Sequence, residues 1–284
     1  MVTPLKRVMV CPPSSAGWTQ ARQAARWREL NYLRAPDAAT AQAHHDALRR
    51  ELEGVGAEVL TLTPGDALSL DAVYCHDTSL VTDFGAIPLR PGKACRADEQ
   101  QHHADFYRAA RVPILGELQS PGTAEAGDMV WLDARTLLVG RGYRTNAAGI
   151  EQLRALLRPH SVEVLAAPLP HGTGPECCLH LMSLMSLLDE RTALVDLSML
   201  AVETVELLRV RGFRFVEIDP AERASLACNV LALGESRLLA LEENARTNTR
   251  LRSAGFNVRT FPGSAIAING GGGPTCLTRP ILRV

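Results

Sequence analysis

The sequence predicts an α/β fold in which five ββαβ units form a ring of five blades. Two observations carry this prediction. First, an amphipathic helix pattern that ends in Gly or Arg is followed directly by a short β-type run, and this pair occurs five times. Second, several of these helices are preceded by two apolar runs with a tight polar turn between them, which is typical of a β-hairpin. Each unit therefore consists of a hairpin, a helix and a strand, with a period of roughly 50 residues.

The five helix and strand pairs follow one another along the whole chain. Helices are expected over 44–56, 102–111, 147–161, 201–212 and 245–255. The strands that follow them are expected over 57–62, 112–118, 162–169, 213–218 and 256–261. The first helix illustrates the pattern, because Leu48, Leu52 and Val55 recur at helical spacing and form one apolar face.

The hairpins and helix starts complete the unit. Hairpins are expected over 129–140 and 229–241, and the tripeptide Arg-Thr-Asn recurs at 144–146 and 246–248, where Asn is expected to cap the helix. One unit cannot bury its own apolar face, so five copies must pack together, and closing them into a ring removes exposed sheet edges. The loops of such a ring converge on its axis, where we expect the functional residues.

Composition narrows the class of protein. With 284 residues, 46% of them apolar, and a net charge of −1, the chain can bury a sizeable core, and we expect a single domain over 1–284. Balanced charge without a basic run disfavours a nucleic-acid partner. No apolar run reaches the length of a membrane span, and the N-terminus lacks a secretory pattern, so a cytoplasmic protein is expected. The seven cysteines have no CxxC spacing, so most should be reduced and buried.

Cys276 is a candidate nucleophile. It follows Gly270 to Gly273, four consecutive glycines that permit close approach of the backbone to something small. A cysteine beyond such a loop can attack as a thiolate when an acid–base group lies nearby. The alternative is a buried cysteine after a flexible turn.

His180 is the candidate acid–base group among the eight histidines. It interrupts the apolar run 177–188, where a polar side chain must be either satisfied as a core histidine or used in chemistry. The histidines at 44, 45, 102 and 103 lie at helix starts and are expected to be solvated or capping. They form no HExxH motif, so no metal site is expected.

Acidic and basic residues beside the hairpins suggest a cation site. Asp77, Glu125 and Asp128 precede β-type runs, where acids either cap turns or hold a planar guanidinium between them. Arg96 and Arg144 could bind a carboxylate at the other end of the same ligand.

Six motifs, taken together and in order, resemble the guanidine-modifying superfamily, and within it the dimethylarginine dimethylaminohydrolase family: HDTSL, PLRPGKACR, TAEAGDMV, GYRTNAAG, CLHLM and GGGGPTCLTRP. The resemblance runs from about Val8 to the C-terminus. It implies a five-bladed pseudosymmetric α/β propeller. It also implies hydrolysis of methylarginine to citrulline and an amine through a covalent S-alkylthiouronium, without a metal or organic cofactor.

The same resemblance assigns roles to seven residues. It implies a nucleophile at Cys276, a general acid/base at His180, guanidinium carboxylates at Asp77 and Glu125, substrate carboxylate contacts at Arg96 and Arg144, and an α-amino contact at Asp71. The dimethylaminohydrolase branch is favoured because His180 is followed by Leu and Met rather than by the His-x-Asp of related branches. The chain departs from that branch at His76, where a Glu is usual. A lid is expected within 14–36.

Other functions remain open at this point. An arginine deiminase-like or citrulline-type hydrolase and an amidinotransferase share the chemistry and differ in leaving group and acceptor. A non-catalytic guanidine-binding protein lies outside enzymes altogether. The expected partner is a small guanidine, and assembly into a homo-oligomer is left open.

Overall fold

The computed structural model describes residues 1–65 and 68–284. Its helices are α1 (Ala21–Ala24), α2 (Ala38–Glu53), α3 (Glu99–Ala109), α4 (Ala147–Leu157), α5 (Val202–Val210) and α6 (Ala245–Ser253). Its strands are β1 (Leu5–Val10), β2 (Glu58–Thr61), β3 (Ser79–Thr82), β4 (Gly85–Pro88), β5 (Met129–Asp133), β6 (Thr136–Arg141), β7 (Glu163–Pro168), β8 (Met185–Leu187), β9 (Thr192–Val195), β10 (Arg214–Glu217), β11 (Leu231–Gly234), β12 (Arg237–Leu241), β13 (Asn257–Phe261) and β14 (Arg279–Arg283).

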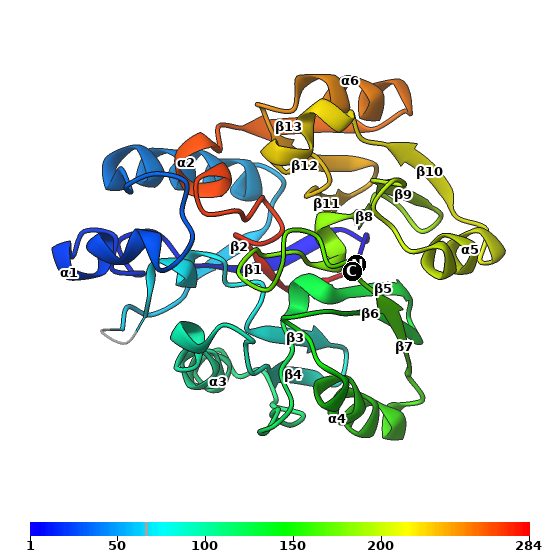
Figure 1. Cartoon of the computed structure of the whole chain (residues 1–284), viewed down its shortest axis with the longest axis horizontal. Helices are drawn as coiled ribbons and strands as arrows, with labels where there is room; N and C mark the ends of the chain where they lie inside the picture. The colour runs from blue at the N-terminus through cyan, green and yellow to red at the C-terminus, as the bar shows by residue number, and fades with distance from the viewer. Residues whose placement is uncertain (66–67) are drawn as a thin grey trace.

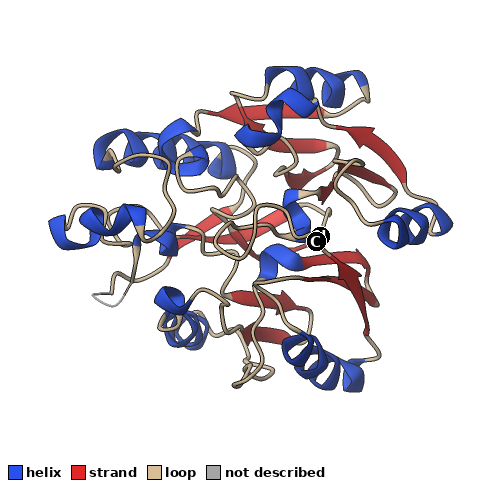
Figure 2. Ribbon diagram, viewed as in Figure 1, coloured by secondary structure: helices blue, strands red, loops and turns tan. Residues whose placement is uncertain are grey.

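The described strands form five small sheets. Their strand orders are β14-β1-β2, β3-β4, β5-β6-β7, β10-β9-β8 and β11-β12-β13. The sheets are arranged around a common centre, and the longer helices α2 to α6 lie on the outside (Figure 1). Figure 2 shows the same separation of an inner layer of strands from an outer layer of helices. The expected α/β class is confirmed, with several small sheets in place of one large sheet.

The unit of hairpin, helix and strand is confirmed in three sheets. In the third unit β5 pairs antiparallel with β6, and β6 pairs parallel with β7 after α4. The units built on α5 and α6 repeat this order. Parallel neighbours need a crossover connection, so the helix between them is forced to the outside of the sheet.

The first sheet joins the two ends of the chain. β14 pairs antiparallel with β1, and β1 pairs parallel with β2. The amide of Val284 donates to the carbonyl of Pro4 over 3.1 Å, and the termini lie side by side near the centre in Figure 1. The C-terminal segment therefore supplies the first strand of a hairpin whose other strand begins the chain.

The strand expected over 112–118 is wrong. Only a single parallel bridge forms there, between Ala86 and Ile114. The carbonyl of Pro113 accepts from the amide of Ala86 and the amide of Leu115 donates back, but neither Pro113 nor Pro88 has an N–H with which to extend the ladder on either side. This sheet therefore keeps two strands.

The two Asn caps have different outcomes. Asn146 caps α4 as expected, since its side chain accepts from the amide of Gly149 over 2.8 Å. The cap expected at Asn248 is wrong, because that residue lies inside α6. The carboxylate of Glu222 accepts hydrogen bonds from the backbone amides of Arg246 and Thr247. Glu222 therefore satisfies the free N–H groups at the start of α6, as an N-cap residue would.

One expectation about polar side chains is also corrected, because two of the four histidines expected to be solvated or capping are buried. His45 and His103 are buried on the inner sides of α2 and α3, where burial lowers their pKa values to about 4 and about 3. All seven cysteines are free, and four are buried, but Cys177 and Cys178 are exposed.

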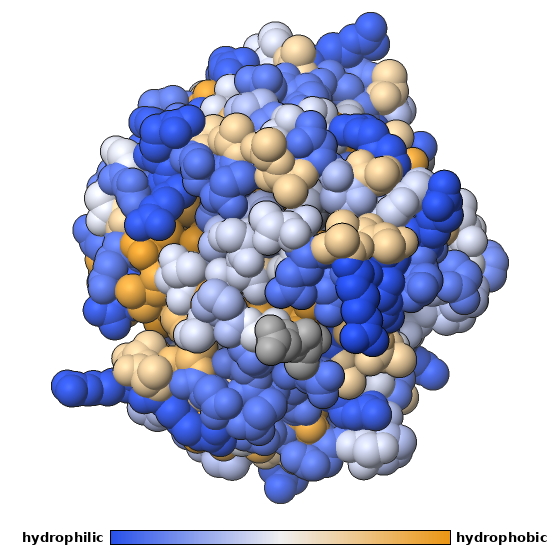
Figure 3. Space-filling view, turned by 90° about the vertical axis from the view of Figure 1, so that its left-hand side faces the viewer, coloured by the Kyte–Doolittle hydropathy of each residue, from blue (hydrophilic) through white to orange (hydrophobic). Residues whose placement is uncertain are grey.

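The face that covers α1 and α2 is mostly hydrophilic (Figure 3), as amphipathic outer helices require. No helix of the described ranges is long and apolar enough to cross a membrane.

Candidate active site

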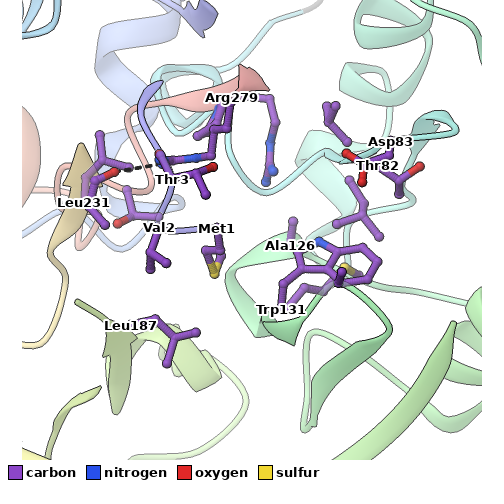
Figure 4. A pocket seen from close by; sticks show the side chains of 18 of the residues that line it. Met1, Val2, Thr3, Thr82, Asp83, Ala126, Trp131, Leu187, Leu231 and Arg279 are labelled. Carbon is purple, nitrogen blue, oxygen red and sulfur yellow. Dashed lines mark hydrogen bonds between the residues drawn. The ribbon is translucent and has the colours of Figure 1, made fainter. Parts of the chain in front are cut away.

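The predicted site residues gather around one cavity of about 160 Å³. All seven line it: Asp71, Asp77, Arg96, Glu125, Arg144, His180 and Cys276. A larger cavity, of about 830 Å³, lies near the chain termini beside Met1, Trp131 and Arg279 (Figure 4). None of the seven lines it, so the predicted residues gather around the smaller of these two cavities.

Each of the five sheets has one polar side chain of the cavity placed two to five residues before the first strand of its hairpin. Asp77, Glu125, His180, Asn229 and Cys276 stand shortly before β3, β5, β8, β11 and β14, which are the first strands of the five hairpins. These five side chains line the same cavity. Asn229 is the one member that the sequence reasoning missed, although its place at the start of the expected hairpin 229–241 was a usable signal.

Cys276 is held by Asn229. The Asn229 Nδ2 donates to Cys276 Sγ over 3.0 Å, and its Oδ1 accepts from the amide of Thr275 over 2.9 Å. A Cβ at Gly273 would lie 2.6 Å from the Asn229 side chain, so glycine is required for this approach. Burial, reinforced by the Asp77 carboxylate, raises the pKa of the Cys276 thiol to about 12. The thiol of the free protein is therefore neutral at neutral pH.

His180 is buried and paired with Glu125. Its Nε2 lies 2.7 Å from Glu125 Oε2. A Cβ at Gly127 would lie 2.3 Å from His180 Nδ1, so the ring packs against a position that must be glycine. Burial lowers the pKa of His180, but the adjacent Cys178 sulfur and the carboxylates of Asp128 and Asp77 raise it by more, well above its ordinary value. His180 is therefore an imidazolium that donates to Glu125.

Glu125 is an anion at the base of the cavity. It is fully buried, and its Oε1 accepts from the amide of Gly92 over 2.9 Å. Burial opposes its charge, but the hydrogen bond and charge of His180, together with the charge of Arg144, lower its pKa to about 2. It is therefore negatively charged at neutral pH.

Asp128 supports the backbone rather than facing a ligand. Its Oδ1 accepts from the amide of Leu181 over 2.9 Å, and its Oδ2 accepts from the hydroxyl of Thr145 over 2.6 Å. Burial raises its pKa to about 6. The structure therefore separates the two acids of TAEAGDMV, because Glu125 lines the cavity and Asp128 fixes the chain beside His180.

Asp77 presents an unpaired oxygen. Its Oδ2 accepts from Arg96 over 2.8 Å. Its Oδ1 is buried without a hydrogen-bond partner in the described part of the chain and lies 3.9 Å from His180 Nδ1. A buried carboxylate oxygen without a donor is costly, so this atom is suited to a donor on a cationic ligand.

Arg96 and Arg144 differ in how many of their N–H groups are available to a ligand. Arg96 donates to Asp77, to the carbonyl of Tyr74 and twice to Glu99, so most of its N–H groups are engaged within the protein. Arg144 makes only a 3.5 Å contact with Glu125, and no side-chain hydrogen bond of Arg144 is formed within residues 1–65 and 68–284. It is buried beside the cavity and free to meet a ligand carboxylate.

Asp71 already has a cation beside it. Lys93 Nζ lies 2.5 Å from Asp71 Oδ2 and donates to the carbonyl of Leu30 over 2.8 Å. Lys93 lies within the PLRPGKACR motif, and no role was predicted for it from the sequence.

His76 faces away from the small cavity. Its Nδ1 lies 2.9 Å from the carbonyl of Thr278, and its side chain lines the larger cavity. The residue that departs from the expected pattern therefore does not line the cavity that holds Cys276.

Three side chains could hold a metal ion. Ligand atoms of Glu125, Cys178 and His180 lie within 4.8 Å of one another, and oxygen, sulfur and nitrogen donors of this kind are those that zinc accepts. Cys178 Sγ lies 3.5 Å from His180 Nδ1. The expectation that no metal is needed is therefore one to be tested by chelation.

Comparison with known proteins identifies similar families. The family model for arginine deiminase matches residues 70–212 and 199–283. The N(G),N(G)-dimethylarginine dimethylaminohydrolase of Pseudomonas aeruginosa is 28% identical over 80% of this chain and 84% of its own. The corresponding protein of Streptomyces coelicolor is 30% identical over 74% of each chain.

Solved structures of the same kind have the same fold. The crystal structure of a dimethylarginine dimethylaminohydrolase adduct with 4-chloro-2-hydroxymethylpyridine has a TM-score of 0.77 and 25% identity, over 99% of this chain and all of that one. The N-terminal domain of ArgZ, an arginine dihydrolase of cyanobacteria, has a TM-score of 0.82 at 18% identity and covers 98% of both chains.

Proposed function

Because the chain belongs to the arginine deiminase family of guanidine-modifying enzymes, we propose that it is a cysteine-dependent hydrolase that converts a methylated arginine to citrulline and an amine. One observation carries the proposal: a thiol, an imidazolium and two carboxylates, one from each of four units, line the same cavity. The names of the relatives from Pseudomonas aeruginosa and Streptomyces coelicolor support the methylated substrate.

The carboxylates of Asp77 and Glu125 would bind the guanidinium of the substrate. A planar cation that donates to Asp77 Oδ1 supplies the missing partner of that oxygen, and Glu125 provides the second carboxylate. A cation next to Cys276 favours the thiolate, so substrate binding lowers the pKa of the thiol from its resting value of about 12, and the thiol proton is lost to solvent. The amide of Asn229 then stabilises the thiolate through its hydrogen bond to Cys276 Sγ.

The first half of the reaction forms the covalent adduct. The thiolate of Cys276 attacks the guanidinium carbon, and the imidazolium of His180 gives its proton to the departing amine. The products are an S-alkylthiouronium on Cys276, a free amine and neutral His180. Glu125 holds the imidazole ring in place through the Nε2 contact of 2.7 Å.

The second half hydrolyses the adduct. Neutral His180 takes one proton from a water molecule, whose oxygen attacks the same carbon. The C–S bond then breaks, and the second proton of that oxygen passes to the sulfur. The ureido product leaves, and the protein returns to a neutral thiol and an imidazolium, which is the resting state that burial and the surrounding charges favour.

We also propose that the five sheets are the blades of a pseudosymmetric α/β propeller in one domain, with part of residues 14–36 as a lid. The repeated position of the five site residues supports the propeller. Leu30 and Asn31 line the small cavity, and Asn31 Nδ2 donates to the carbonyl of Glu176 across its mouth. This contact is consistent with a lid that excludes water during the first half of the reaction.

A substrate panel tests the proposed function. Arginine, mono- and dimethylarginine, citrulline, agmatine and guanidino acids are each incubated with the protein, and products are identified by mass spectrometry. Release of methylamine or dimethylamine with citrulline is the expected result. Release of ammonia from arginine as the main activity would instead favour an arginine deiminase, the function for which the matching family model is named. Absence of any turnover would leave a guanidine-binding protein.

Replacement of Arg144 by alanine is expected to weaken turnover of amino acid substrates about 10- to 100-fold in kcat/KM, because a charge-assisted contact with the carboxylate contributes roughly 1.5–3 kcal/mol. Residual turnover of agmatine, which has no carboxylate, should barely change. Steady-state kinetics on both substrates measure the effect. Arg141, which is exposed at the end of β6, gives a matched control as Arg141→Ala. Equal losses on both substrates would mean that Arg144 acts only on stability.

Chelators are expected to leave activity unchanged, because the proposed thiolate and imidazolium perform both halves of the reaction without a Lewis acid. Activity is measured after dialysis against EDTA and again after addition of zinc, manganese or iron. Loss of activity that one metal restores would show that Glu125, Cys178 and His180 hold a functional ion.

A further inference from the structure

We propose that Lys93 stands in for the α-ammonium group of an amino acid substrate, so that this site also accepts methylated guanidino carboxylic acids that have no α-amino group. The inference rests on the proposed function, since it concerns the far end of the same ligand. It adds a substrate class and assigns Lys93 as the residue that determines it.

The contacts of Lys93 place its ammonium group where a ligand ammonium is expected. Its Nζ lies 2.5 Å from Asp71 Oδ2 and also donates to the carbonyl of Leu30. The side chains of Lys93 and Asp71 are 17% and 5% exposed, so the pair is largely shielded from solvent. Both residues line the small cavity.

The position of Lys93 is fixed by its neighbour in the chain. The amide of Gly92 donates to Glu125 Oε1 over 2.9 Å. A Cβ at Gly92 would lie 2.8 Å from the carbonyl oxygen of Arg144, so the loop approaches that backbone as only glycine can. Lys93 is therefore built into the same local structure that holds Glu125 and Arg144, rather than extended at random into solvent.

The Asp71–Lys93 ion pair distinguishes ligands that have an α-ammonium group from ligands that lack one. The negative charge of Asp71 is already balanced by Lys93, so a second ammonium at this carboxylate would meet a like charge at close range. An amino acid must displace Lys93 or share Asp71 with it. A guanidino acid without the amino group leaves the Asp71–Lys93 pair intact.

The remaining charge at this end of the cavity suits a carboxylate. Arg144 is buried there with no hydrogen bond from its side chain among the described residues, whereas Arg96 is engaged by Asp77 and Glu99. With Asp71 paired to Lys93, Arg144 is the side chain of this cavity that can meet a ligand carboxylate. A ligand with a guanidinium at one end and a lone carboxylate at the other is therefore complementary to the site.

The test compares two substrates of equal length. Asymmetric dimethylarginine and its deamino counterpart, N,N-dimethyl-5-guanidinopentanoate, differ only in the α-ammonium. The native protein is expected to turn over the deamino compound with a kcat/KM at least equal to that of the amino acid. The variant Lys93→Met should shift the ratio of the two kcat/KM values about 10- to 100-fold toward dimethylarginine, because it frees Asp71.

Controls keep the result interpretable. Lys6, the only other lysine of the sequence, is exposed on β1, and Lys6→Met should leave the ratio unchanged. If Lys93→Met does not fold, Lys93→Gln and calorimetric binding of both compounds to the Cys276→Ser variant provide the same comparison without turnover.

The outcomes distinguish this inference from the proposed function. Turnover of dimethylarginine alone, with a ratio that Lys93→Met does not change, overturns the role of Lys93 and leaves the hydrolase intact. Turnover of neither compound by the native protein contradicts the hydrolase itself. A ratio that shifts in Lys93→Met but not in Lys6→Met supports the proposal.

Discussion

Replacement of Cys276 by serine is expected to reduce turnover of every guanidine substrate by about 1000-fold or more while leaving the fold intact. The guanidinium carbon is a weak electrophile because resonance spreads its charge, so an anionic nucleophile is required. Burial raises the pKa of the Cys276 thiol to about 12 in the free protein, and in the proposed mechanism a bound cation is what makes it an anion. A hydroxyl ionises far less readily than a thiol, so serine has no comparable anion to offer.

The experiment measures both the rate of citrulline formation and the mass of the intact protein. Citrulline formation is followed in the native protein and in Cys276→Ser, and intact-protein mass spectrometry of quenched reactions detects the covalent adduct. The exposed neighbour Cys177 provides a control, because Cys177→Ser removes a thiol near the same cavity without removing Cys276. Retention of more than a few per cent of activity in Cys276→Ser would rule out the covalent mechanism.

The repeated unit could be predicted from sequence because its elements are local. The alternation of amphipathic helix and short strand is set within about 20 residues, and tight turns and caps such as Asn146 act over three or four. The same reasoning failed where a distant group intervened. Asn248 lies within α6, because Glu222 from another part of the chain accepts from the amides at the helix start.

The pairing of β14 with β1 could not be derived from local pattern. These strands come from opposite ends of the chain, and the antiparallel pairs Met9 with Arg279 and Val8 with Pro280 form only when the two ends of the chain meet. Local pattern likewise gave a strand at 112–118, where the lack of an N–H on Pro113 reduces the ladder to a single bridge.

The candidate site likewise contains residues that local sequence pattern indicates and residues that it does not. Cys276 and His180 stood out because a glycine run and an interrupted apolar run are visible in sequence, and their roles remain proposals that the variants test. The partners that tune them are long-range. His180 and Glu125 are 55 residues apart, and Asn229 is 47 residues from Cys276. Such contacts depend on packing between units, so a single sequence indicates the reacting groups more readily than their supports.

Replacement of His180 by glycine is expected to slow both halves of the reaction, each by about 100- to 10,000-fold, because one side chain acts first as acid and then as base. The pKa of His180 lies well above its ordinary value, so the native imidazolium is available at neutral pH. The native rate should rise with pH as the Cys276 thiolate forms and fall again where His180 loses its proton. The variant should lose that alkaline fall, since no imidazolium remains to titrate. Rates over a range of pH, with the adduct followed by mass spectrometry, measure both effects.

A matched control and a stability measurement complete this prediction. His171 lies in a loop, where its Nδ1 is hydrogen-bonded to the hydroxyl of Tyr143. The variant His171→Gly should therefore retain activity and an unchanged pH profile. Glu125 contributes stability above its unfolded pKa near 4.5, and this is lost as the pH falls through its folded pKa of about 2. Without His180 the folded pKa of Glu125 rises toward the unfolded value, so acid unfolding of His180→Gly should begin at a higher pH than in the native protein. Normal turnover in His180→Gly would remove His180 from the mechanism. A rate loss with an unchanged pH profile would show that it acts only through Glu125.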